Sequence, residues 1–158
     1  LMVMHRLAAR FTCVAYELPD GTTDGSRLAR YTHADYVADL LALLDHLKFP
    51  TAAVLGSSFG STIALSALAA APDRFTHGVI QGGFARRPLN GPQRRLAQVA
   101  RFWPWWFGNW PEIYMRVMRR VERPTLSALP REVADFFLEV GGRTPIRASA
   151  LRSLSIAR

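Results

Sequence analysis

Short β-rich runs alternate with longer amphipathic stretches in the first half of the chain. Residues 51–55 (TAAVL) and 76–81 (THGVIQ) are bounded by proline or glycine, which is typical of short strands. Residues 33–48 and 61–71 place leucine and alanine at helical spacing. With a further strand predicted at residues 11–17, the order strand, helix, strand, helix, strand predicts parallel strands joined by right-handed helical crossovers, and therefore an α/β fold.

Three further elements are predicted nearer the start of the chain. Residues 1–10 have the pattern of a helix end, and residues 11–17 (FTCVAYE) are β-rich and predict another strand. Residues 18–26 (LPDGTTDGS) are dense in turn-forming residues and predict a loop. Thr32 can then cap the following helix, with Asp35 three residues later in its first turn.

The second half of the chain has a different composition. From residue 85 onward arginine, tryptophan and proline dominate, and no strand is predicted. Three helices are expected there, over residues 92–101, 112–121 and 131–140. All four tryptophans lie in the segment 102–111 (FWPWWFGNWP). We therefore expect a core over residues 1–84 and a helical part over residues 85–158.

The positive charge is concentrated in the helical part. The chain carries 20 Lys+Arg and 12 Asp+Glu, a formal net charge of +8. Residues 1–84 hold six basic and seven acidic residues, whereas residues 85–158 hold 14 arginines and five acidic residues. Such an asymmetry is typical of a half that faces a nucleic acid or a membrane, and it equally fits a general preference for arginine over lysine, which is the interpretation we prefer. Since no basic run or nucleic-acid-binding signature accompanies the charge, we expect no nucleic-acid partner.

No segment has the composition of a leader peptide or a membrane helix. Residues 1–15 carry two arginines inside their apolar stretch, and residues 49–72 hold six Ser or Thr and no Trp or Tyr. We therefore expect a cytoplasmic protein. The single cysteine, Cys13, excludes an intrachain disulfide and is expected to be a core residue of its strand. No metal, nucleotide or redox cofactor is implied.

Residues 56–60 (GSSFG) match the pattern Gly-x-Ser-x-Gly between a predicted strand and a predicted helix. A strand that turns into a helix so quickly forces Ser58 into a strained backbone conformation. Glycine at positions Gly56 and Gly60 removes side chains that would clash across the turn. The Ser58 hydroxyl then stands at the positive end of the helix, where the Phe59 N–H can donate to a developing oxyanion. Two flanking serines are expected to be structural: Ser57 and Ser61.

This stretch resembles the nucleophile elbow of the α/β-hydrolase fold family. Residues 54–65 (VLGSSFGSTIAL) match the elbow strand, the nucleophile and the following helix, and residues 71–75 (APDRF) match the link to the next strand. Residues 16–26 resemble the loop after the fourth strand of the family, with glutamate in place of the usual aspartate and two extra loop residues. The Gly-Ser-Thr-x-Ala-Leu run resembles the prolyl iminopeptidase branch. The resemblance covers about residues 5–84 and puts residues 85–158 where the family has its helical cap.

The resemblance implies a serine hydrolase that cleaves an ester, amide or related acyl bond through an acyl-enzyme at Ser58. Its partner would be a small substrate, hydrophobic or acyl in character. The catalytic triad of the family runs serine, then Asp or Glu, then histidine. The chain contains four histidines: His5, His33, His46 and His77. None follows residue 77, and the downstream carboxylates lie in a surface link or in Arg-flanked helical stretches, so neither the base nor the acid is identified.

We therefore expect a partial α/β-hydrolase sheet with helices on both faces and a helical cap. The N-terminal strands of the family, and the C-terminal strands that carry its Asp and His, are absent from the sequence. The chain also begins with Leu1. These features favour a hydrolase fragment that is inactive or nearly so by itself. The alternative is a non-catalytic hydrolase-like protein that binds a partner or a membrane surface through its basic, Trp-rich cap.

The tryptophan cluster has three interpretations, which do not exclude one another. The preferred one is that the rings pack the cap onto itself and onto the core. In the second, the cluster lines a substrate pocket or lid, with Trp103, Trp106 and Trp110 as candidate pocket residues. In the third, arginine and tryptophan together contact a lipid surface.

Overall fold

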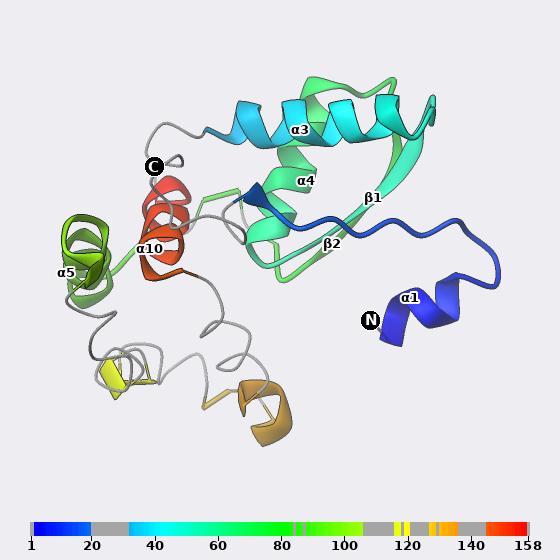
Figure 1. Ribbon diagram of the computed structural model, residues 1–158. Coiled ribbons are helices and arrows are strands. Elements are labelled where there is room, and N and C mark those ends of the chain that lie inside the picture. The colour runs from blue at the N-terminus through cyan, green and yellow to red at the C-terminus, as the bar shows by residue number, and fades with distance from the viewer. Residues whose placement is uncertain are drawn as a thin grey trace.

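The structure, a computed structural model, places a small α/β unit beside a pair of helices (Figure 1). It describes residues 2–19, 32–83, 85–86, 88–105, 116–117, 119–120, 127–128, 130–135 and 145–157. The elements of the α/β unit are α3 (His33–His46), β1 (Ala52–Ser57), α4 (Phe59–Ala70) and β2 (Phe75–Gln81). The others are α1 (Met2–Leu7), α5 (Gly91–Phe102) and α10 (Ile146–Ser155).

Strands β1 and β2 form a parallel two-stranded sheet, with α4 as the connection between them. Val54 pairs with Gly78, and the register continues to Ser57 opposite Gln81. Parallel neighbours need a crossover rather than a hairpin, and the helix supplies it. The second half of the predicted order, parallel strand, helix and strand over residues 51–81, is confirmed.

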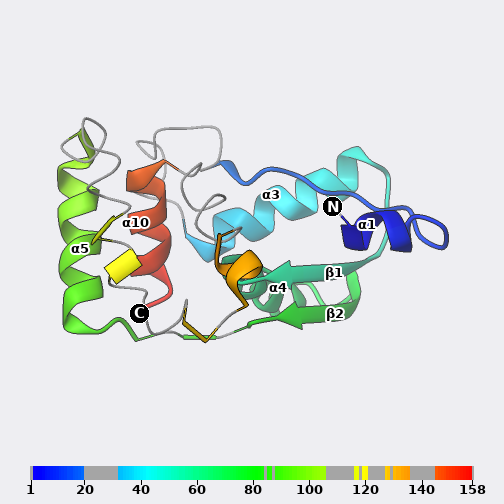
Figure 2. The ribbon, with the colours of Figure 1, turned by 90° about the horizontal axis from the view of Figure 1, so that it is seen from below.

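Helices α3 and α4 pack on the same face of the sheet. The apolar cluster beneath them joins Val37 of α3, Ala67 of α4 and Val54 of β1. Leu55, the residue after Val54 in β1, points to the opposite face of the sheet. There Leu55 and its cross-strand partner Val79 are 54% and 55% exposed. The expected second layer of helices is therefore not present among the described residues. Helix α4 contacts both strands, and α3 packs on α4 (Figure 2).

Helix α3 begins where the sequence predicted. Thr32 is its N-cap: the Asp35 N–H donates to the Thr32 hydroxyl, while Asp35 Oδ2 lies 2.6 Å from the Thr32 nitrogen. This reciprocal capping box satisfies backbone N–H groups that have no partner inside the helix. Val37 and Leu44 then face the core, in agreement with the predicted apolar stripe.

The predicted strand over residues 11–17 is wrong. The segment is extended but pairs with no described strand, and most of it is exposed. A strand needs a neighbour to take up its backbone N–H and C=O groups, and β1 and β2 pair only with each other among the described residues. Cys13 is accordingly half-buried rather than a core residue. Partial burial of the Tyr16 side chain and the nearby Asp39 carboxylate raise the pKa of Tyr16.

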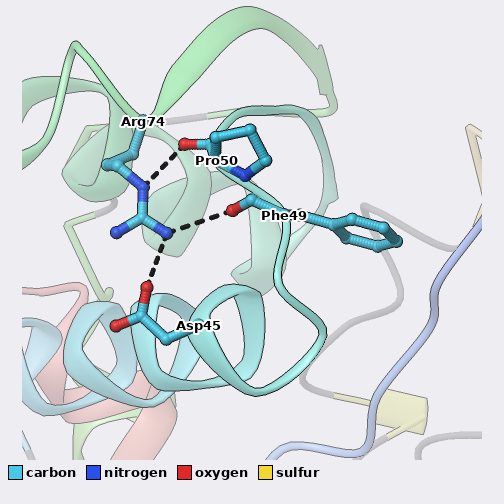
Figure 3. A network of polar contacts seen from close by, with 4 residues as sticks. All are labelled: Asp45, Phe49, Pro50 and Arg74. Carbon is cyan, nitrogen blue, oxygen red and sulfur yellow. Dashed lines mark hydrogen bonds and ion pairs between the residues drawn. The ribbon is translucent and has the colours of Figure 1, made fainter.

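Arg74, in the turn before β2, ties three parts of the α/β unit together (Figure 3). Its Nε donates to the Pro50 carbonyl at 2.8 Å, and its Nη2 donates to the Phe49 carbonyl at 3.2 Å. The same Nη2 forms an ion pair with Asp45 near the end of α3. The guanidinium thus fixes the entry to β1 against the helix that precedes it.

Helices α5 and α10 pack on each other through small residues. Ala97 and Ala100 of α5 are buried against Ala150 of α10. Helix α10 was not predicted, although apolar side chains recur at four-residue spacing in it: Ile146, Ala150 and Leu154. The predicted helix at 92–101 is confirmed. Within the predicted helices 112–121 and 131–140, the described residues 116–117, 119–120 and 131–135 are helical, and the others lie outside the described residues. None of the helices in the described ranges has the length and apolar character needed to cross a membrane.

Candidate active site

Ser58 stands at the junction of β1 and α4 with a backbone conformation that L-residues rarely adopt. Its φ is 52° and its ψ is −119°, and among the described non-glycine residues only Lys48 also has a positive φ. The Ser58 N–H donates to the Gln81 carbonyl of β2 at 3.0 Å. On its other side the Ser58 carbonyl accepts from the Ser61 N–H at 3.0 Å and from the Ser61 hydroxyl. These bonds hold both adjacent peptide groups, so the strained conformation is imposed by the surrounding fold.

The turn is so tight that Gly56 cannot carry a side chain. A Cβ on Gly56 would lie 2.7 Å from the carbonyl carbon of Gly60 and 2.7 Å from Ser61 Cα. Both are backbone atoms and cannot swing away. A Cβ on Gly60 itself would meet nothing within 4 Å. The prediction that both glycines relieve a clash is therefore confirmed for Gly56 and wrong for Gly60.

The Ser58 hydroxyl is presented at the start of α4. Ser58 is exposed and is the N-cap of α4, but its side chain makes no capping hydrogen bond. The first turn of α4 contains no acidic residue that would offset the partial positive charge of the helix end. The Phe59 N–H lies in that first turn, where backbone N–H groups have no acceptor inside the helix. A hydroxyl and a backbone donor therefore stand side by side at the electropositive end of a helix.

The two flanking serines have different environments. Ser61 is completely buried, and its hydroxyl donates to the Ser58 carbonyl, which gives it a structural position under the elbow. Ser57 is the last residue of β1 and is exposed. The sequence did not predict the Ser61 hydrogen bond, because it depends on the geometry of the turn.

The Phe59 ring is surrounded by residues from α3 and from the C-terminal part of the chain at α10. Tyr36 of α3 meets it edge-on, with the ring centroids 5.5 Å apart. Arg152 of α10 places Cζ 5.2 Å from the ring centroid, and Ile156 packs in the same cluster. His33 lies at 6.3 Å between ring centroids. Sequence reasoning missed these neighbours, since nothing local to the motif points to residues so distant in the chain.

None of the described histidines has the position expected of the general base. His5, His46 and His77 are exposed, on α1, α3 and β2. His33 contacts the elbow through the Phe59 ring, and its Nε2 is buried without a hydrogen-bond partner. In the part of the chain that the structure describes, no cluster of His, Cys, Asp or Glu side chains could hold a metal ion.

The predicted pocket residues are only partly described. Trp103 is the C-cap of α5 and is 51% exposed. Trp106 and Trp110 lie outside the described residues. A pocket lined by the three rings therefore stays a prediction.

Comparison with known proteins gives a family. A family model described as the alpha/beta hydrolase fold matches residues 3–146, which include β1, the elbow, α4, β2 and α5. No curated protein and no solved structure matches the chain significantly. The family match spans most of the sequence and agrees with the parallel strands and the helical crossover between them. The chain belongs to the alpha/beta hydrolase fold family.

Proposed function

We propose that Ser58 is the nucleophile of a serine hydrolase that cleaves an ester, amide or related acyl bond. The observation that carries this proposal is the conformation of Ser58, with φ 52° and ψ −119° at the end of β1 and the start of α4. A serine held in this strained turn, with its hydroxyl exposed and not used for capping, is what a nucleophile elbow requires. Family membership supports the reaction class.

In the proposed reaction the Ser58 oxygen attacks the carbonyl carbon of the substrate while its proton passes to a base. The carbonyl oxygen becomes an oxyanion, which accepts a hydrogen bond from the Phe59 N–H. The bond to the leaving group then breaks, the leaving group takes up a proton, and an acyl-enzyme remains on Ser58. Water attacks the acyl-enzyme and restores the serine.

We propose that the 158 residues alone turn over slowly. No histidine follows His77, and none of the described histidines makes a hydrogen bond to the Ser58 hydroxyl. Without a base the serine is a weak nucleophile. The substrate would be a small hydrophobic or acyl compound, with residues 85–158 as the cap over the core. The likeness to the prolyl iminopeptidase branch remains a prediction within this proposal.

The experiment is active-site labelling with a fluorophosphonate, in which added imidazole stands in for the base. We expect slow labelling of Ser58, located by peptide mass spectrometry, with a rate that rises as imidazole is added. Ser58→Ala should abolish the label, and the matched variant Ser57→Ala should keep it. Labelling that survives in Ser58→Ala, or that does not respond to imidazole, would contradict the proposal.

A further inference from the structure

Helix α5 has one side packed and one side turned away from the molecule. Ala97 and Ala100 face Ala150 of α10 and are buried. In both ribbon views α5 lies at the outer edge of the molecule, with α10 between it and the α/β unit (Figures 1 and 2). In the part of the chain that the structure describes, the side of α5 opposite the alanines is exposed.

The outward side of α5 carries arginine near its start and aromatic rings at its end. Arg94, Gln98 and Phe102 recur every four residues and so share one face, which Arg95 adjoins. All four are exposed. Phe102 is 61% exposed, and Trp103 and Trp105 just beyond it are 51% and 64% exposed. We call this set the α5 patch: Arg94, Arg95, Phe102, Trp103 and Trp105.

The stretch of sequence that contains the patch carries charge of one sign: residues 75–111 hold five arginines and no Asp or Glu. One of the five, Arg101, places Cζ 5.1 Å from the centroid of the Phe102 ring. A partner for this surface must therefore be anionic and must also accept large apolar rings.

We propose that the α5 patch binds the surface of an anionic lipid bilayer. Arginines attract anionic headgroups, while tryptophan and phenylalanine insert at the boundary between headgroups and acyl chains. The aromatic rings gather at the end of α5 instead of alternating with the arginines along it, so one end of the helix can enter the boundary while the rest lies on the surface. A nucleic-acid strand is the less suitable partner because the arginines and the rings do not interleave along one track. The proposal does not depend on chemistry at Ser58.

Intrinsic tryptophan fluorescence tests the proposal directly, since all four tryptophans lie within residues 103–110. The full chain is titrated with vesicles of phosphatidylglycerol and phosphatidylcholine, and with vesicles of phosphatidylcholine alone. We expect a blue shift of the emission with the anionic vesicles only, and quenching by brominated acyl chains. Rising salt should weaken the binding.

Matched control variants distinguish binding by the α5 patch from a general effect of positive charge or of exposed apolar side chains. Arg94→Gln with Arg95→Gln should weaken binding to anionic vesicles roughly 30-fold, because each arginine near the surface contributes a factor of about five. The control Arg6→Gln with Arg10→Gln removes the same charge from another exposed segment and should leave binding within about twofold of the unmodified chain. Phe102→Ser should weaken binding at least several-fold and leave the tryptophan reporter intact, whereas Phe11→Ser, at an equally exposed phenylalanine, should not weaken it.

Three outcomes would overturn the proposal. The first is no binding to anionic vesicles at low salt, and the second is an equal loss of binding in the patch variants and their controls. The third is binding to a single-stranded oligonucleotide in the absence of any binding to vesicles, which would make the patch a nucleic-acid surface. Circular dichroism of each variant shows whether the helices are retained.

Discussion

The Arg74 guanidinium lies 2.7 Å from the Asp45 carboxylate, so the turn before β2 is linked to the last part of α3. The Arg74 side chain is 30% exposed and the Asp45 side chain 66% exposed. An ion pair in such a position contributes little, because water screens it and two long side chains lose freedom. The bonds from Arg74 to the carbonyls of Phe49 and Pro50 are local anchors of the chain just before β1. We infer that these carbonyl bonds, more than the ion pair, make Arg74 important for stability.

Arg74→Ala should therefore destabilise the fold more than Asp45→Ala. We expect a loss of about 1–2 kcal/mol for Arg74→Ala, since it removes two hydrogen bonds from a charged donor to carbonyls. Asp45→Ala should cost less than about 1 kcal/mol, as measured for exposed ion pairs. Urea unfolding followed by circular dichroism gives both values. Equal losses in the two variants would mean that the ion pair, and not the carbonyl bonds, stabilises this junction.

Much of this fold depends on local sequence and could therefore be predicted from it. The capping box at Thr32, the strand–helix–strand order and the strained turn at Ser58 each depend on a few consecutive residues. The failed strand at residues 11–17 shows the limit, because pairing depends on a neighbour elsewhere in the chain. The Arg152 contact with Phe59 could not be predicted for the same reason, since only tertiary packing brings α10 to the elbow.

The two glycines of the elbow should respond oppositely to alanine. Gly56→Ala puts a Cβ against the backbone of Gly60 and Ser61, so the turn must open. We expect a loss of about 2–3 kcal/mol or more, in the range of overpacked sites. Gly60→Ala is the matched control: the site is open, φ is not positive, and alanine favours the helix. A gain of up to about 1 kcal/mol is expected there.

Chemical denaturation of both variants checks this asymmetry. Equal losses of stability at the two positions would show that a Cβ is excluded at Gly60 as much as at Gly56, contrary to the contacts around the two glycines. The fluorophosphonate label provides a second measurement. We expect Gly60→Ala to keep the label on Ser58 and Gly56→Ala to lose it, because an opened turn no longer presents the hydroxyl.

Ser58→Gly should stabilise the chain relative to Ser58→Ala. Both variants remove the hydroxyl, which makes no capping bond, but only glycine adopts a φ of 52° without a steric penalty. Strain of this kind costs on the order of 1–3 kcal/mol. Glycine relieves the strain, but its greater conformational freedom in the unfolded chain offsets part of that stabilisation. We expect a net difference of about 1 kcal/mol in the free energy of unfolding, measured by urea titration. A Ser58→Gly variant that is less stable than Ser58→Ala would show that the elbow is unstrained.

The capping box of α3 should make the stability of the chain depend on acid pH. Hydrogen bonds from the Thr32 backbone N–H and then from the Thr32 hydroxyl hold the pKa of Asp35 below its ordinary value. The Asp35 carboxylate therefore binds a proton less readily in the folded state than in the unfolded state. The stabilisation is complete above the ordinary pKa of an aspartate and disappears as the pH falls through the lowered pKa of the folded state.

Asp35→Asn should remove this part of the pH dependence. We expect the difference in unfolding free energy between the unmodified chain and Asp35→Asn to be largest near neutral pH and to shrink in acid, because protonation makes Asp35 uncharged in both states. Thr32→Ala removes the hydroxyl but keeps the backbone N–H, which is the larger cause of the lowered pKa, so it should flatten the profile only in part, whereas Thr32→Ser keeps both donors and should preserve it. Urea titrations between neutral pH and the acid range measure the profiles. If Asp35→Asn and the unmodified chain keep a constant difference down to the lowest pH, Asp35 does not act through its charge, and the cap stabilises α3 by hydrogen bonding alone.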